Sequence, residues 1–248
     1  MTKSGNSPSG APWRNFYGRV KGKTFHASQK RYWDEELPKW QVPNIDWQDN
    51  PDRAVIDLSA HFGNAPVWLE VGFGSGEHLV HMAQQYPDVG FIGVEPFLNG
   101  VATLLGKIRR VGVTNIRVHP GDARDLMDVL PVGSIDRAFL LYPDPWPKKR
   151  HHRRRFVTQE HLRPLACTMR AGAELRVATD IADYVRQTLV EVPQAGFSWT
   201  AQGAQDWRRP WEDWLSTRYE QKAIREGRPQ HYLTFQRDPS LDAAGALG

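Results

Sequence analysis

The segment Leu69-Glu70-Val71-Gly72-Phe73-Gly74-Ser75-Gly76-Glu77, residues 69–77, places three alternating glycines between an apolar run and a stretch with helical spacing. The apolar run, 66–71, predicts a buried strand, and residues 77–86 predict a helix. Glycines in such a turn let the backbone approach a ligand closely. The pattern is not the dinucleotide motif G-x-G-x-x-G, because the third glycine comes one residue early. We therefore expect a ligand-binding turn that contains Gly72, Gly74 and Gly76.

Strands and helices alternate along the rest of the chain. Apolar runs predict further strands at 91–94, 116–118, 135–141 and 175–178, and helical spacing predicts helices at 97–110 and around Leu126, Leu162 and Val185. This alternation is typical of a mostly parallel sheet with helices on both faces. A helix at 218–226 and a strand at 230–235 follow, and this strand can close the sheet as an antiparallel partner. The predicted fold class is therefore α/β and Rossmann-like.

The α/β domain is expected at 63–237, between a preceding extension and two tails. Residues 1–12 and 238–248 are small and polar and are predicted to be tails. Residues 13–62 form a basic and aromatic extension, in which Asn50-Pro51 predicts the start of a helix that ends near Phe62. Residues 13–47 show no clear helical or alternating period. They are interpreted either as an arm that faces RNA or as an extension that packs its aromatic side chains onto the domain.

Composition and charge restrict the class of protein. With 40% hydrophobic and 24% charged residues, the chain resembles neither a disordered nor a membrane protein, and no apolar run approaches the ~20 residues of a membrane span. The first residues have no apolar core, so we expect no secretory signal and a cytoplasmic protein. The single cysteine, Cys167, excludes an internal disulfide and argues against a thiolate metal site.

The positive charge of the chain is concentrated in one segment. Residues 148–155 contribute six Lys or Arg and no acid, which leaves 26 basic and 28 acidic residues elsewhere. A single basic segment on an otherwise slightly acidic chain indicates a polyanionic partner.

Acidic residues lie at or just after the ends of the first three predicted strands. Glu70 and Glu77 flank the glycine turn and suit a cationic ligand that carries a sulfonium and an amino group. Glu95 ends the second strand 19 residues after Gly76, close to the offset at which an acid takes ribose hydroxyls. Asp122 follows the third strand, where it can meet an adenine amino group or only cap a helix. Together these acids predict a site for a nucleoside that bears a sulfonium.

A proline-rich segment follows the fourth strand. In Pro143-Asp144-Pro145-Trp146-Pro147, three prolines disfavour both helix and strand and predict a stiff loop at the carboxyl edge of the sheet, where ligands bind. Asp144 would be held rigidly, Trp146 offers a stacking plane, and the following basic residues offer phosphate contacts. The alternative interpretation is an ordinary turn, a tryptophan over the core and a solvated helix start.

These segments together resemble the bacterial tRNA (guanine-N7)-methyltransferase family, the TrmB type. The resemblance covers about 68–235 and is carried by residues 70–74, 91–95, 143–151 and 217–220. It implies a Rossmann-like class I methyltransferase that uses S-adenosylmethionine and acts on a guanine of tRNA, at position 46. It also implies donor binding by Glu70, Glu95, Asp122 and Asp144, with Asp144 catalytic as well. The resemblance further implies substrate binding by Lys148, Asp180, Thr217, Arg218, Tyr219 and Glu220, and RNA contact by Arg150, His151, His152, Arg153, Arg154 and Arg155.

The chemistry of guanine N7 fits this set of residues. N7 carries an in-plane lone pair and can attack a sulfonium methyl group without a base, so catalysis is mainly positioning. The product ring is cationic, and Asp144 is the candidate carboxylate to stabilise the developing charge. Asp180, which ends the fifth strand, can accept hydrogen bonds from guanine N1–H and the exocyclic amine, or can cap a helix. No cluster of metal ligands and no obligatory protein partner is evident in the sequence.

Two other functions stay open at this point. The Asp-Pro-Trp-Pro segment is reminiscent of the loops of exocyclic-amine methyltransferases, although the basic continuation disfavours that reaction. The chain can also be a noncatalytic RNA-binding module on the same fold, although acids at four strand ends disfavour that class.

Overall fold

A computed structural model describes residue 10 and residues 12–239, and these residues form one seven-stranded sheet. The strand order is β3-β2-β1-β4-β5-β7-β6. The strands are β1 (Val67–Val71), β2 (Gly90–Val94), β3 (Ile116–His119), β4 (Ile135–Leu141), β5 (Met169–Thr179), β6 (Phe197–Trp199) and β7 (His231–Arg237). Strands β1 to β5 pair in parallel, whereas β7 pairs antiparallel with β5 and with β6. The predicted α/β class and its antiparallel C-terminal strand are confirmed.

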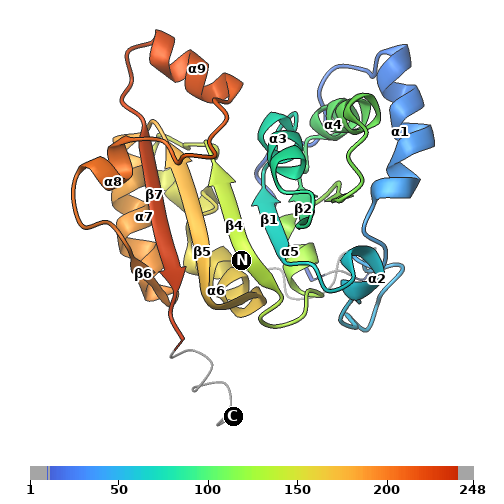
Figure 1. Ribbon diagram of the computed structural model, residues 1–248, viewed down its shortest axis with the longest axis horizontal. Coiled ribbons are helices and arrows are strands. Elements are labelled where there is room, and N and C mark those ends of the chain that lie inside the picture. The colour runs from blue at the N-terminus through green and yellow to red at the C-terminus, as the bar shows by residue number, and fades with distance from the viewer. Residues whose placement is uncertain (1–9, 11, 240–248) are drawn as a thin grey trace.

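Helices flank both faces of this sheet (Figure 1). They are α1 (Ala27–Trp40), α2 (Ser59–Phe62), α3 (Glu77–Gln85), α4 (Leu98–Val111), α5 (Ala123–Met127), a 3₁₀ helix η1 (Lys149–Arg154), α6 (Gln159–Thr168), α7 (Ala182–Gln194), α8 (Gln205–Arg208) and α9 (Arg218–Arg225). Helices α1, α3 and α4 contribute to the hydrophobic core on one face of the sheet, and α5, α6 and α7 to the core on the other.

Side-chain alternation along β1 builds these two cores. Leu69 and Val71 belong to one core and Trp68 to the other, and all five residues of β1 are buried. A strand buried on both faces reads as a continuous apolar run, which is why the sequence located it. Glu70 is the polar exception, and it lies at the carboxyl end of the strand.

The N-terminal extension differs from its prediction in two places. The helix expected from Asn50 to Phe62 exists only as its last turn, α2, because the side chain of Asn50 closes a loop instead of capping a helix. Its amide donates to the carbonyl oxygens of Asn44 and Ala54, at 2.9 and 2.8 Å, and its oxygen accepts from Ala54 N. In addition, Arg53 has a positive φ of 53°, which no α-helix allows.

A helix that the sequence did not reveal, α1, packs on α4. Its buried residues include a charged one, Glu36, beside Leu37, so its apolar stripe is incomplete. The short strand β6 and the helix α8 were also missed. No helix among the described residues is long and apolar enough to cross a membrane. The predicted tails lie largely outside the described residues, and the domain boundaries stay predictions.

Candidate active site

A cavity of about 700 Å³ lies at the carboxyl ends of β1, β2 and β4, bounded also by the turn after β3. This volume is within the range of small-molecule sites in proteins. The cavity brings together residues that are far apart in the sequence. Of the residues predicted for the site, those that line it are Glu70, Gly72, Gly74, Glu95, Asp122, Asp144, Arg153, Arg154, Thr217, Arg218 and Tyr219.

The glycines of the turn after β1 have two different roles, lining of the cavity and packing of a helix. Gly72 and Gly74 line the cavity with φ angles of 75° and 58°, and at Gly72 an added Cβ would meet no atom within 4 Å. Gly76 is buried and is not among the residues that line the cavity, and its contact with a ligand stays a prediction. It caps α3 with a φ of 74°, and an added Cβ would lie 2.4 Å from Cδ1 of Leu104. Gly76 is therefore needed for the close packing of α3 on α4.

Glu70 is held by a histidine that the sequence did not single out. Its carboxylate lies 2.8 Å from Nδ1 of His78, and both residues are only 3% exposed. The ring of His78 packs edge-on against Phe139 and is tilted against Trp214. The carboxylate is therefore fixed in orientation while Glu70 still lines the cavity.

Glu95 supports the glycine turn from the end of β2. One carboxylate oxygen accepts from Gly74 N at 2.7 Å and the other from Phe97 N at 2.8 Å. Burial, together with the negative charges of Asp144 and Glu70, raises the pKa of Glu95 to about 7, although the two backbone hydrogen bonds act in the opposite direction. A cavity that contains several carboxylates and raises the pKa of one of them favours a cationic ligand.

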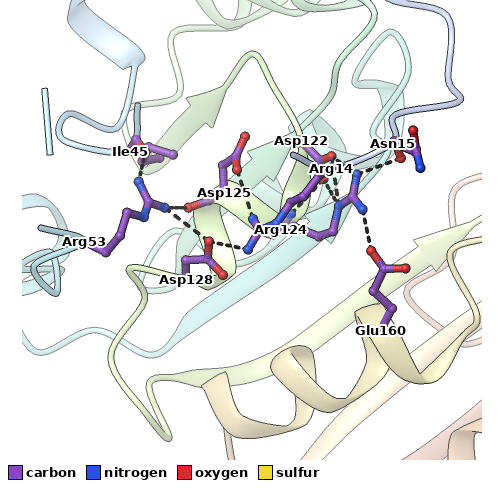
Figure 2. Close-up of polar contacts among 9 residues, drawn as sticks. All are labelled: Arg14, Asn15, Ile45, Arg53, Asp122, Arg124, Asp125, Asp128 and Glu160. Carbon is purple, nitrogen blue, oxygen red and sulfur yellow. Dashed lines mark hydrogen bonds and ion pairs between the residues drawn. The ribbon is translucent and has the colours of Figure 1, made fainter. Parts of the chain in front are cut away.

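Asp122 caps α5, which is one of its two predicted roles, and it also lines the cavity, while its contact with an adenine amino group stays a prediction. Its side chain accepts from Arg124 N at 2.9 Å and forms an ion pair of 2.5 Å with the guanidinium of Arg124. Burial acts to raise the pKa of Asp122, but the hydrogen bonds from Arg124 outweigh it and the pKa is lowered. Figure 2 shows that Arg124 also reaches Glu160 and the carbonyl oxygen of Asn15.

The N-terminal arm, residues 14–19, forms part of the cavity wall. Residues 15–19 line it, and Arg14 forms ion pairs with Asp125 and Asp128 at 3.1 and 2.7 Å (Figure 2). This segment thus packs onto the domain, which is one of the two roles expected for it. No motif identified Arg124 or the arm as part of the site, because their contacts join residues about 110 positions apart in the sequence.

The proline-rich loop after β4 places Asp144 at the cavity. Tyr142 and Trp146 have positive φ angles of 49° and 40°, which are strained for residues other than glycine. Asp144 is exposed to the cavity, and the surrounding protein raises the pKa of its carboxyl group. Unfavourable backbone at a residue that faces a cavity is typical of a functional site.

The basic segment after this loop forms η1. The guanidinium of Arg154 lies 4.7 Å from the ring centroid of Tyr17 and 5.0 Å from that of Trp146, so it connects the N-terminal arm to the proline-rich loop. The residues of this segment that are exposed, and therefore available to a phosphate backbone, are Lys148, Lys149, Arg150 and Arg153. His151 and His152 are half-buried.

Arg155 is an exception that corrects the prediction of RNA contact. It is 1% exposed, and its guanidinium bonds to Pro145, Asp183 and Gln187 inside the protein. A side chain enclosed in this way presents no surface to RNA.

Two of the predicted substrate-binding acids are engaged by protein groups and do not line the cavity. Asp180 forms an ion pair with Arg228, and the cap of α7 is Ile181, so Asp180 does not cap that helix. Glu220 is 2% exposed and accepts from Nε1 of Trp214 and the hydroxyl of Tyr232. Lys148 is exposed outside the cavity lining.

The fold and this cavity together define a Rossmann-like methyltransferase. A solved structure of a 16S rRNA methyltransferase, KamB, has this fold, with a TM-score of 0.55 and 19% sequence identity over 73% of this chain and 91% of that one. Residues 64–233 match a protein family described as "Putative methyltransferase".

Curated relatives identify the family of methyltransferases to which the chain belongs. A protein of Ruegeria sp. (strain TM1040) is 67% identical over 94% of this chain and 92% of its own length. A protein of Roseobacter denitrificans is 68% identical over 92% of this chain and 97% of its own length. Both are named tRNA (guanine-N(7)-)-methyltransferase. The chain belongs to the tRNA (guanine-N7)-methyltransferase family, as the resemblance of its motifs predicted.

Proposed function

We propose that this protein transfers the methyl group of S-adenosylmethionine to N7 of a guanine in tRNA. The observation that carries the proposal is the presence of strand-end carboxylates in the cavity and of exposed cations in the segment that follows the Asp144 loop. A cavity lined by Glu70, Glu95 and Asp144 adjoins a rim that exposes Lys148 to Arg150 and Arg153. The carboxylates at the strand ends suit a cationic methyl donor, and the basic rim suits the phosphates of RNA.

The chain's own residues fit the donor. Glu95 can accept from ribose hydroxyls, because a carboxylate offers about four acceptor sites and only two backbone N–H groups occupy them here. Asp122 borders the same cavity and is assigned to the adenine amino group, and Glu70 to the cationic part of the donor. The bound donor supplies an electrophilic methyl group on sulfur. No group of three or more candidate metal ligands occurs in the described part of the chain, and we propose a reaction without metal.

Asp144 is proposed to be the catalytic residue. Guanine N7 needs no deprotonation, so the protein has to position the base in line with the methyl group and stabilise the cationic ring that forms. Asp144 lines the cavity from the proline-rich loop, together with the residues assigned to the donor, and the basic segment follows it directly in the chain. An ionised Asp144 lowers the energy of the transition state because positive charge grows on the base beside it.

Recognition of guanine is assigned to the residues at the start of α9 and to Asp180. Thr217, Arg218 and Tyr219 line the cavity at the start of α9. Asp180 can keep its ion pair with Arg228 and still accept from guanine N1–H and the exocyclic amine. Glu220 would act indirectly, since its oxygens hold Trp214 and Tyr232. Lys148 and the exposed arginines of the rim would contact the tRNA backbone.

The test is a methyl-transfer assay on defined RNA. The protein is incubated with methyl-labelled donor and unmodified tRNA, and the labelled nucleoside is identified by mass spectrometry. We expect label in N7-methylguanosine. Label on an exocyclic amine would support the other methyltransferase reaction, and binding of tRNA without any transfer would contradict an enzymatic function.

A further inference from the structure

The loop that carries Asp144 has few backbone groups with which to hold its conformation. Pro143, Pro145 and Pro147 lack an N–H donor. Two residues beside these prolines have a positive φ angle: Tyr142, just before the first proline, and Trp146, between the second and the third. Strained backbone persists only where surrounding groups hold it in place. The loop is anchored at its start by Tyr142, whose N–H donates to Ala178 O at 2.8 Å.

Arg155 supplies a second anchor, from inside the protein. Its Nε donates to the carbonyl oxygen of Pro145 at 2.8 Å, immediately after Asp144. Its two amino groups donate to Oε1 of Gln187 and Oδ2 of Asp183, each at 2.8 Å. The guanidinium also lies 5.2 Å from the ring centroid of Tyr184. Each nitrogen of the buried guanidinium therefore donates to a group on α7 or on the loop itself.

Asp183 links this arrangement to the first turn of α7. It accepts from Arg155 on one oxygen and from the exposed Arg186 on the other, at 3.1 Å. His152 of η1 lies 3.2 Å from the same carboxylate. Helix α7 packs against the sheet beside β5. Arg155 and Asp183 therefore connect the Asp144 loop to the core of the domain.

We infer that Arg155 is a positioning residue, which places the Asp144 loop for methyl transfer through its bond to Pro145 and its ion pair with Asp183. This inference rests on the proposed function, in which Asp144 stabilises the cationic base. Arg155 touches neither the cavity nor the molecular surface, so its effect on the reaction must pass through the loop. A misplacement of about 1 Å in a reacting group can cost roughly 10²-fold in rate.

The experiment measures single-turnover methyl transfer at saturating donor and tRNA, and separately the affinity for each. Arg155→Gln should lower the single-turnover rate by roughly 10²-fold, with both affinities nearly unchanged. Arg155→Lys keeps the charge but offers fewer directed donors, so it should recover part of the rate. Asp183→Asn, on a more exposed residue, should cause a smaller loss of rate in the same direction.

Arg186→Gln is the matched control. Arg186 also binds Asp183, but it is exposed and does not reach the loop, so its loss should leave the rate and both affinities unchanged. A normal single-turnover rate in Arg155→Gln would overturn the inference. Weaker tRNA binding with a flatter salt dependence and a normal rate would also overturn it, in favour of RNA contact.

Two further outcomes separate the possible failures. If Arg155→Gln does not fold, normal rates in both Arg155→Lys and Asp183→Asn would overturn the inference instead. A wild-type protein that transfers no methyl group to guanine N7 would contradict the proposed function. A wild-type protein that does so while all variants match it would contradict only the role of Arg155.

Discussion

Arg14, in the N-terminal arm, forms an ion pair of 2.7 Å with Asp128, which directly follows α5. The same guanidinium reaches Asp125, and Arg53 approaches Asp128 from the loop before α2. Helix α5 begins at the cap Asp122, so one short helix connects the arm to the wall of the candidate donor site (Figure 2). The arm therefore lines the cavity in a position that its ion pairs to α5 help to fix.

Loss of Arg14 should accelerate release of the donor. In Arg14→Ala both ion pairs to α5 disappear, and partly exposed ion pairs contribute up to about 1 kcal/mol each. We expect the dissociation rate of S-adenosylmethionine to rise roughly three- to tenfold, since 1.4 kcal/mol corresponds to a factor of ten. Stopped-flow displacement would measure this rate. Lys30→Ala, which breaks an exposed ion pair with Asp34 on α1, is the control. Equal dissociation rates in the two variants would contradict a role of the arm in retaining the donor.

Donor binding should release protons below neutral pH. The pKa of Glu95 is raised to about 7 in the free protein, and a cationic ligand favours the ionised carboxylate and so lowers this pKa. Between the lowered pKa and pH 7 the affinity should rise with pH, at most about tenfold per unit, and above pH 7 it should level off. Calorimetry in buffers of different ionisation enthalpy counts the protons released.

Glu95→Gln tests whether this carboxylate is the source of the protons. The variant carries no charge at this position at any pH, so its donor affinity should be lower at pH 8 and should vary less with pH. Loss of a charge-assisted contact typically costs about 1–3 kcal/mol. Proton release that persists unchanged in the variant would assign the titration to another group, with Asp144 the next candidate, because its pKa is also raised by burial.

The exposed arginines of the rim should determine the salt dependence of tRNA binding. Each phosphate contact adds roughly 0.7–0.9 to the slope of log affinity against log salt concentration. Joint substitution of Arg150 and Arg153 by Gln should therefore flatten the slope by about 1.5 and leave donor affinity unchanged. Filter binding over a salt series provides the slope. Arg163→Gln, an exposed change on α6, should keep the wild-type slope, and an unchanged slope in the double variant would mean that the rim is only a solvated surface.

Much of the sheet was predictable because its strands are buried on both faces. Residues 67–71, apart from Glu70, and residues 138–141 are apolar and buried, so the sequence pattern located both strands. Helix α1 carried no such signal. Its packing depends on Tyr32 lying over the bare surface of Gly106 on α4, where an added Cβ would be 2.7 Å from Cε2 of the ring. That fit joins residues far apart in the sequence, and no local period reveals it.

In the candidate site, too, the sequence pattern predicted some residues and could not predict contacts between residues far apart in the chain. Glu70, Glu95 and Asp144 could be predicted because each lies at or shortly after the carboxyl end of a strand, and parallel strands end at a common edge. Arg153, Arg154 and Arg155 are adjacent and identical in type, yet the structure exposes the first, stacks the second between two rings and buries the third. The difference depends on the direction of each side chain in η1 and at its C-cap, Arg155, and on Asp183, 28 residues after Arg155.

Asp144→Asn should separate catalysis from binding. The substitution keeps the size of the side chain and its place in the proline-rich loop, but removes the negative charge that would stabilise the cationic base. By analogy with the loss of one preorganised hydrogen-bond donor from an oxyanion site, the single-turnover rate should fall by ~10²–10³. Affinity for tRNA should change much less, because interactions that act only in the transition state do not contribute to ground-state binding.

The contrast with Asp180→Asn completes this test. Asp180 lies outside the cavity lining and is proposed to accept from the guanine edge, so its amide should impair recognition of the base, since the new amino group opposes a donor. We expect a raised KM for tRNA and a smaller fall in the rate at saturation. Rapid-quench measurements over a range of tRNA concentrations distinguish the two effects. A near-normal rate in Asp144→Asn, together with a large loss in Asp180→Asn, would require the catalytic role to be assigned to Asp180.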